Sequence, residues 1–389
     1  SSKNIGNLYS LSKSGNYLYW DKNNLTSNMN FIITFGAAFL LSGVFTPMAI
    51  ILAKKYKLVD NPKTHKHPAI LHKKTVPRAG GLAIYLSVLL ASILFLEFSQ
   101  KLLGIFLGGL ILVIFGLVDD RRGLSAGTRL LGQFFAALIV VASGVGIAFI
   151  PNPISAVLGQ GYEVIRLDTV RLIFDFMGEH SVLIFADLFA LFWIVWVINM
   201  VNFSSGVDGQ MPGIVLVALI VMFAASLRFL ETDPSQIVVS QLALIGAGAT
   251  AGFLIFNFYP AKIFPGDSGS YFLGFLVAVV AILSGAKVGA AILVMAIPLI
   301  DGVFTIARRV ASHKSPFVGD RGHLHHRLLE LGWGQRRVAL YYWLICAILG
   351  AAALGLSSSE KIFAGVVVAV IVLGGLLWLN MNLPQRDQK

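Results

Sequence analysis

Two adjacent acids close an apolar stretch of the chain. Asp119 and Asp120 follow residues 102–118 and precede Arg121 and Arg122. Neighbouring side chains on a helix point about 100° apart, so the two carboxylates cannot share one task. The helix dipole disfavours an anion at a helix C-terminus by about 0.3–1 kcal/mol, so a cation must compensate. The pair is therefore either part of a catalytic site or a hydrated helix end neutralised by Arg121 and Arg122.

Amides and glycines gather at residues 199–209. Asn199 and Asn202 are three residues apart and share a helical face, and Asp208 follows them. Amide oxygens and carboxylates are hard ligands that Mg²⁺ accepts, usually beside phosphates. The glycines of this run allow a turn that a ligand can approach closely. The alternative is structural, with the amides hydrogen-bonding one helix to another.

A second glycine-containing turn lies at 264–270, just before an apolar segment. Asp267 should therefore lie at a helix N-terminus, where free N–H groups can also hold phosphate. Phe264 offers a ring on which a base can stack. The alternative is an ordinary helix cap formed by Asp or Ser beside turn glycines.

Three histidines lie in a basic loop between 308 and 327. They could bind zinc, but Asp320 is the only nearby acid, so the loop is better suited to an anion. A solvated loop is the alternative. The histidines are His323, His325 and His326, and the arginines are Arg308, Arg309, Arg321 and Arg327.

Two further acids lie at or inside apolar segments. Asp187 is expected to cap the helix that begins there. Asp301 is an acid within an apolar stretch and so a functional candidate by default. It lies seven residues before Arg308 on the same helical face, so a structural ion pair is an equal interpretation.

The elements that must position these residues are membrane helices. Of the 389 residues 57% are hydrophobic and only 13% are charged, about half the usual charged share of soluble domains. These figures exclude soluble globular, disordered and fibrous proteins. The single cysteine, Cys346, lies in an apolar segment, which excludes a disulfide scaffold. The net charge of +11 comes from basic residues in short loops between the apolar segments. We therefore expect these charges to orient the chain in a membrane, and we expect no nucleic-acid partner.

The chain is predicted to be an all-α polytopic membrane protein with about eleven transmembrane helices. Residues 1–28 are expected to form a polar tail without a signal-peptide pattern, with Met29 a candidate original start, and 29–389 a single integral-membrane domain. The runs are continuously apolar, which favours helices over a β-barrel. The candidate spans are 31–53, 80–97, 102–118, 128–150, 187–201, 212–230, 239–258, 270–285, 288–307, 338–356 and 361–379.

The basic residues predict how the chain is oriented. Most of the 30 Lys and Arg residues fall on one side if the N-terminus is out and the C-terminus is in. All four polar clusters then lie on the cytoplasmic face, as an active site would require. The longest outer loop, 151–186, alternates in hydropathy around Tyr162–Phe176 and is expected to form a small extracytoplasmic β-hairpin.

Taken together, the motifs resemble the polyprenyl-phosphate N-acetylhexosamine-1-phosphate transferase family, over about residues 31–345. Residues 72–81 (HKKTVPRAGG) are similar to its first cytoplasmic loop, and Asp119-Asp120 to its paired aspartates. Residues 199–209 resemble its N-x-x-N-x-x-D-G-x-D-G stretch, and Asn257 with 264–267 its asparagine followed by F-x-G-D. HLHH at 323–326 matches its histidine loop, and five motifs in order are highly specific.

The resemblance implies transfer of a sugar 1-phosphate from a UDP-N-acetylhexosamine to polyprenyl phosphate, with release of UMP. It also implies a location in the bacterial cytoplasmic (inner) membrane, with the active site facing the cytoplasm. The implied cofactor is Mg²⁺ (or Mn²⁺), and a homodimer is possible. Catalysis is assigned to Asp119, Asp120 and Asp267, and metal binding to Asn202 and Asp267. Nucleotide-sugar binding is assigned to Asn199, Asp208, Asn257, Phe264, Gly266, Arg308, Arg309, His323, His325 and His326. Lipid-phosphate binding is assigned to His72, Lys73, Lys74 and Arg78.

Two positions depart from the family pattern. Ser205 stands where the first aspartate of D-G-x-D-G is usual, which puts the role of that acid in doubt here. The first loop reads DNPKTHKHPAILHKK, longer than the basic R-K-x-H run of relatives, so its phosphate-binding residue stays open.

The histidine loop favours one sugar over another. The stretch 315–333 (SPFVGDRGHLHHRLLELGW) resembles the N-acetylglucosamine branch, whereas the muramoyl-pentapeptide branch tends to read H-H-H with an acid soon after. We therefore expect UDP-N-acetylglucosamine or a close C4 or C6 variant, with phospho-N-acetylmuramoyl-pentapeptide transfer as the alternative. Two other classes are an anion transporter, which would need mid-membrane polar residues in repeated halves, and an inactive scaffold.

Overall fold

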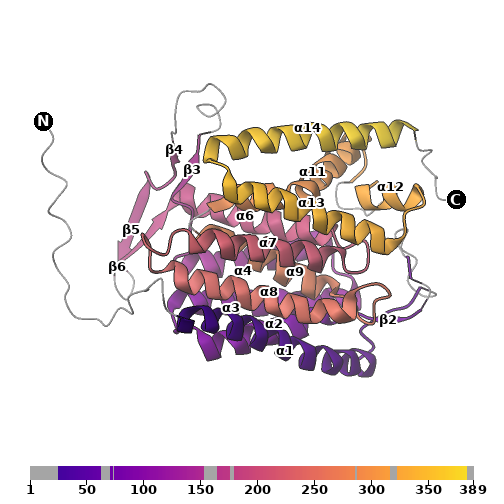
Figure 1. Ribbon diagram of the computed structural model, residues 1–389, viewed down its shortest axis with the longest axis horizontal. Helices are drawn as coiled ribbons and strands as arrows, with labels where there is room; N and C mark the ends of the chain where they lie inside the picture. Colours follow the sequence, from indigo (N-terminus) through magenta and orange to yellow (C-terminus); the bar gives the residue numbers. More distant parts are fainter. Residues whose placement is uncertain are drawn as a thin grey trace, which may run out of the picture.

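The computed structural model is a bundle of helices with three short two-stranded sheets (Figure 1). It describes residues 25–62, 71–72, 74–152, 164–175, 179–284, 287–315 and 322–382. The all-α polytopic prediction is confirmed. In these residues the helices are α1 (Leu25–Lys55), α2 (Gly80–Phe95), α3 (Gln100–Arg122), α4 (Ala126–Ala142), α6 (Ile184–Phe203), α7 (Gln210–Leu227), α8 (Gln236–Asn257), α9 (Gly266–Leu283), α10 (Lys287–Val294), α11 (Ala296–Ala311), α12 (Leu324–Glu330), α13 (Gln335–Gly355) and α14 (Ser358–Asn382).

Every predicted span lies largely on a helix, but the spans are not equivalent. Within the described residues, eight helices are long and apolar enough to cross a membrane, and α2 and α4 are shorter. The predicted span 288–307 is broken, because α10 and α11 meet at an angle of 79° around Met295. The predicted span 128–150 is wrong beyond Ala142, where Gly144 adopts a positive φ of 95° and ends the helix. The exact number of crossings stays a prediction.

The centre of the bundle is α9, which packs against α2, α3, α6, α7 and α10. Small residues allow these backbones to approach closely, which is how membrane helices commonly associate. A Cβ on Gly116 of α3 would overlap the backbone of Ser268, and one on Gly81 would overlap Ser268 and Gly269. These glycines bring the end of α3 and the start of α2 directly onto the first turn of α9.

The strands lie at the two ends of the bundle (Figure 1). At one end β3 (Phe149–Pro151) pairs with β4 (Val164–Arg166), and β5 (Arg171–Asp175) pairs with β6 (Glu179–Leu183). The β-structure predicted in 151–186 is therefore present, although Tyr162 and Phe176 lie outside the described residues. At the opposite end β1 (Val59–Asp60) pairs with β2 (Val76–Pro77).

The two ends of the described chain lie at opposite ends of the bundle. The first helix begins at the end of the bundle where β5 and β6 lie, and α14 ends at the opposite end, near α12 (Figure 1). This relation fits an odd number of crossings, while the predicted N-out, C-in direction stays untested. The predicted polar tail, 1–28, falls largely outside the described residues, and α1 already begins at Leu25. The single domain predicted for 29–389 stays a prediction as well.

Candidate active site

A cavity of about 520 Å³ lies where α3 and α6 end and α7 and α9 begin. The predicted polar clusters meet there, so their gathering on one face of the bundle is confirmed for the residues that line it. The predicted site residues that line the cavity are His72, Arg78, Asp119, Asp120, Asn202, Asp208, Asn257, Phe264, Gly266, Asp267, His323, His325 and His326.

Asp120 caps the first turn of α9 from another helix. Its Oδ1 accepts the backbone N–H of Asp267 at 2.8 Å, and its Oδ2 accepts the N–H and hydroxyl of Ser268 at 3.3 and 3.1 Å. The carboxylate thus occupies the anion site that a helix N-terminus provides. Gly266, with a φ of 70°, permits this because a Cβ there would overlap the Asp120 carboxylate.

Asp119 contacts a different set of partners from Asp120, as expected because adjacent side chains on a helix point in different directions. Its Oδ2 accepts from the Tyr271 hydroxyl and from Arg129 Nε, both at 2.9 Å, and its Oδ1 accepts the N–H of Leu124 at 2.7 Å. The compensating cation is therefore Arg129 of α4. The side chains of Arg121 and Arg122, which the hydrated-helix-end interpretation required, are exposed, and in the described chain it is Arg129 that pairs with Asp119.

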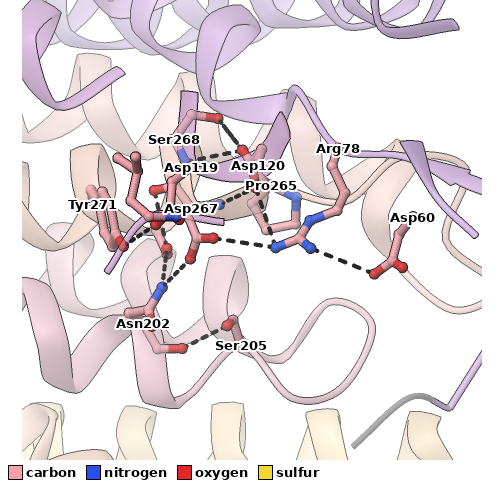
Figure 2. Close-up of polar contacts among 12 residues, drawn as sticks. Asp60, Arg78, Asp119, Asp120, Asn202, Ser205, Pro265, Asp267, Ser268 and Tyr271 are labelled. Carbon is pink, nitrogen blue, oxygen red and sulfur yellow. Dashed lines mark hydrogen bonds and ion pairs between the residues drawn. The ribbon is translucent and has the colours of Figure 1, made fainter. Parts of the chain in front are cut away.

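Asp267 is the most accessible of the three carboxylates. Figure 2 shows it between Asn202, which donates to Oδ1 at 3.0 Å, and Arg78, which lies 3.4 Å from Oδ2. Its side chain is 15% exposed, against 1% and 0% for Asp119 and Asp120. Asn202 also donates to Ser270 Oγ at 2.7 Å, which ties the end of α6 to α9.

Arg78 links the first loop to the acids. Its guanidinium lies 3.2 Å from Asp120 Oδ1 and 3.7 Å from Asp60 Oδ2 (Figure 2). Burial opposes the charge of Arg78, but the carboxylates of Asp120, Asp267 and Asp60 outweigh it and raise its pKa above the ordinary value. The loop is held by main-chain bonds, since the Phe264 N–H donates to the Pro77 carbonyl at 2.8 Å.

Phe264, Asn257 and Asp208 shape the other wall of the cavity. The Phe264 ring lies edge-on to His72, with centroids 5.1 Å apart. Asn257 accepts the N–H of Gly209 at 3.0 Å and donates to the Ile263 carbonyl at 2.8 Å. Asp208 accepts the N–H of Ala261, and burial raises its pKa. Asn257 and Asp208 therefore join two loops as well as facing the cavity.

The histidine loop packs as a stack of rings. The ring centroids of His323 and His325 are 5.4 Å apart with an interplanar angle of 8°, and those of His325 and His326 are 4.3 Å apart. His325 lies against Gly206, where a Cβ would overlap its ring. Burial and the two neighbouring histidines hold the pKa of His325 well below 6.5, so its ring is neutral at physiological pH.

Some predicted site residues lie elsewhere. Asn199 donates to Gln133 at 2.6 Å and to the Val195 carbonyl at 2.7 Å, the helix-linking alternative stated above. The exposed Lys74, and Arg308 and Arg309 of α11, do not line the cavity formed by the described residues. Lys73, Arg321 and Asp320 lie outside those residues. Asp187 lies in the first turn of α6 and accepts the Leu183 N–H at 2.9 Å, so it satisfies a donor at the helix start as predicted, although the helix begins earlier, at Ile184.

Comparison with known proteins identifies the family. The model of glycosyl transferase family 4 matches residues 102–285, from α3 to α9. A decaprenyl-phosphate N-acetylglucosaminephosphotransferase of Mycolicibacterium smegmatis is 32% identical over 373 residues, 87% of this chain and 86% of that protein. The chain belongs to glycosyl transferase family 4.

Two further relatives are named as enzymes that transfer different sugar phosphates. A probable undecaprenyl-phosphate N-acetylglucosaminyl 1-phosphate transferase of Bacillus subtilis is 28% identical over 351 residues, 88% of this chain and 89% of that protein. A phospho-N-acetylmuramoyl-pentapeptide-transferase of Bacillus cytotoxicus is also 28% identical, over 82% of this chain and 96% of its own length. Both relatives therefore match this family 4 chain over more than four fifths of either length.

The donor set at Asp267 fits a magnesium ion. In the described part of the chain no group of three or more His, Cys, Asp or Glu side chains has the geometry to hold a metal ion by itself. Magnesium sites commonly use only one or two carboxylates and take their other oxygens from water and substrate phosphates. The partly exposed Asp267 carboxylate matches that pattern, with Asp119 and Asp120 close behind it. Asn202 turns its NH₂ group towards Asp267 here, so its oxygen would bind the ion only with the amide flipped.

Three polar residues of the site in this family 4 chain belong to none of the five motifs and were not predicted. Arg129 of α4 and Tyr271 of α9 contact Asp119, and Asp60 of β1 contacts Arg78. Arg129 and Tyr271 sit in otherwise apolar helices. Spacing within one helix gives no signal for a partner on another helix. A polar side chain near the end of an apolar span was the only available cue.

Proposed function

We propose that this chain transfers N-acetylglucosamine 1-phosphate from UDP-N-acetylglucosamine to polyprenyl (undecaprenyl) phosphate. The products are polyprenyl-diphospho-N-acetylglucosamine and UMP, and the reaction would be the first membrane step of a cell-surface glycan pathway. The observation that carries the proposal is the convergence of the aspartates, Arg78 and the histidine loop on one cavity at the end of an apolar bundle. The names of the two N-acetylglucosamine relatives support the choice of sugar.

The reaction replaces one pyrophosphate linkage by another, so the protein has little covalent work to do. Its task is to position two polyanions and to balance their charge. Arg78 and Arg129 lie 3.2 and 2.9 Å from the acids that line the cavity, and Phe264 offers a ring for the uracil base. Asp119 and Asp120, each held by several donors, orient the surrounding helix ends and cations.

Asp267 and Asn202 would hold the Mg²⁺ ion. When bound, Mg²⁺ (or Mn²⁺) supplies Lewis-acid polarisation of the donor pyrophosphate. Asp267 contributes the accessible carboxylate, which is also the part of the cluster that a phosphate-bound metal can reach. We expect Asp267→Asn to fold and to lose metal-dependent turnover.

The acceptor would reach the cavity from the bilayer. Exposed apolar side chains cover α1 and α14, as a lipid-facing surface requires, and the cavity lies at the helix ends. A phosphate headgroup at the membrane surface can meet a water-soluble donor there. We place the protein in the bacterial inner membrane with this end in the cytoplasm. The homodimer stays a prediction.

Muramoyl-pentapeptide transfer is the second candidate, supported by the Bacillus cytotoxicus relative. A cavity of about 520 Å³ lies in the range of single small-ligand sites. A pentapeptide arm would have to lie outside it. The H-L-H-H sequence at 323–326 also favours the N-acetylglucosamine branch.

The test is release of UMP by purified protein. We expect release only when UDP-N-acetylglucosamine, polyprenyl phosphate and Mg²⁺ are all present, and loss of release in Asp267→Asn. Exposed Lys314→Gln, which lies outside the lining of the cavity in the described residues, is the surface control. Uptake of the nucleotide sugar into vesicles without UMP release would instead indicate a transporter, and neither activity would indicate a scaffold.

A further inference from the structure

Asp301 is a buried acid that the proposed chemistry does not use. It lies in α11, just past the break at Met295, and only 4% of its surface is exposed. It does not itself line the cavity within the described chain. A carboxylate inside an apolar helix is costly unless donors satisfy it, and such residues are commonly functional.

The two oxygens of Asp301 serve different groups. Oδ1 accepts the backbone N–H of Leu324 at 2.8 Å, which secures the start of α12. Oδ2 lies 2.9 Å from Nδ1 of His323. Thr305 Oγ1 approaches the same nitrogen at 3.3 Å, a longer contact. The carboxylate therefore holds both the backbone and the ring at the beginning of the histidine helix.

This contact selects one tautomer of His323. An ionised carboxylate only accepts hydrogen bonds, so Nδ1 must carry the proton. Nε2 is then the ring nitrogen left for the cavity, which His323 lines. The stacked ring of His325 and the ring of Phe203, at 5.4 and 5.7 Å between centroids, fix the plane of the imidazole.

We propose that Asp301 is a positioning residue that holds His323 as the Nδ1-protonated tautomer, with the unprotonated Nε2 left to accept a hydrogen bond from a hydroxyl group of the bound nucleotide sugar. The contact between His323 and the nucleotide sugar rests on the proposed function, whereas the assignment of the tautomer does not. The alternative is that Asp301 only secures α12 through Leu324. The two roles differ in whether the contact between Asp301 Oδ2 and His323 is needed for activity.

The variant Asp301→Asn separates these roles. The amide oxygen can still accept from Leu324, but the NH₂ group opposes a protonated Nδ1 and favours the other tautomer. We expect kcat/KM for the donor to fall about 10-fold or more, by analogy with the general cost of misplacing a catalytic group. Thr305→Val, which removes only the longer contact, should change it less than about 3-fold.

A double-mutant cycle tests whether Asp301 acts through His323. If it does, Asp301→Asn should cause little further loss in the His323→Gln background. An equal additional loss in that background would overturn the proposal, because a purely structural role is additive. Wild-type kcat/KM in Asp301→Asn would overturn it as well.

The ¹⁵N chemical shifts of the histidine rings give a readout that needs no substrate. His323 is assigned by the signals missing in His323→Gln, and we expect protonated Nδ1 and unprotonated Nε2 at neutral pH. The opposite tautomer in the wild-type protein would overturn the proposal even if Asp301→Asn fails to fold. If the wild type releases no UMP, the proposed function fails, but this measurement still decides the role of Asp301.

Discussion

Individual residues of the site were predictable where a motif carried them. The acids at 119, 120 and 267 and the histidines at 323, 325 and 326 all line the cavity, although they are far apart in sequence. Their partners were not predictable in the same way. Asp119 meets Arg129 across α3 and α4, a contact fixed by helix packing and invisible to spacing within one segment.

Gly206 gives a residue-scale prediction. A side chain there would displace His325, so we expect Gly206→Ala to lower transfer activity about 10-fold or more, equivalent to about 1.4 kcal/mol. Gly127→Ala is the matched control, because nothing lies within 4 Å of its added Cβ. Steady-state transfer kinetics check this, and equal activity of the two variants would contradict the placement of His325.

Asp208 predicts a pH dependence of stability. Burial raises its pKa, so its neutral form favours the fold, and that contribution is lost as pH rises from about 4 through the raised value. Asp208→Asn keeps an acceptor for the Ala261 N–H. We expect it to raise the apparent melting temperature at neutral pH, with the gap closing towards about pH 4.

Asp233 is a control of opposite sign for that measurement. Burial opposes its charge, but hydrogen bonds from Ser235 and Gln236 prevail and lower its pKa. Asp233→Asn should therefore destabilise the protein at neutral pH, and less so as the pH falls. Thermal unfolding in detergent across this pH range measures both. A gap for Asp208→Asn that widens in acid would show that the sign is wrong.

At the scale of elements, apolar length predicted where helices lie but not how they end. Residues 128–150 are mostly apolar, yet the helix α4 stops before Gly144 and the chain turns into β3. The break at Met295 has no matching drop in hydropathy. Both features depend on local backbone geometry and on packing, which composition does not encode.

The contact between α3 and α9 is the element on which the site depends most. Because a Cβ at Gly116 would overlap Ser268, Gly116→Ala should push the Asp120 carboxylate away from the α9 N-terminus. We expect a loss of about 1–3 kcal/mol in stability, as for other overpacked cores, together with lost transfer activity. Gly374→Ala in α14, with open space around it, is the control. An unchanged melting temperature for Gly116→Ala would refute the close packing.

At the scale of the whole molecule, the charge distribution predicted a common face for the polar clusters, and the cavity bears out that they meet. The direction of that face is a separate prediction, since it rests on the bias of Lys and Arg between loops.

Labelling of single cysteines tests the direction. The only cysteine, Cys346, is buried and can be replaced by serine to give a cysteine-free background. We expect Ile173→Cys, exposed on β5, to react with an impermeant maleimide in intact cells. Lys314→Cys, beyond α11, should react only after the cells are opened. The reverse pattern would invert the topology and leave the site unchanged.

The central claim is the transfer of N-acetylglucosamine 1-phosphate to a polyprenyl phosphate. The most direct measurement is the mass of the lipid product formed by purified protein from an equimolar mixture of UDP-N-acetylglucosamine and UDP-N-acetylmuramoyl-pentapeptide. We predict polyprenyl-diphospho-N-acetylglucosamine, with UMP released in equal amount. A product carrying the muramoyl-pentapeptide, or no diphospho-lipid at all, would contradict the account.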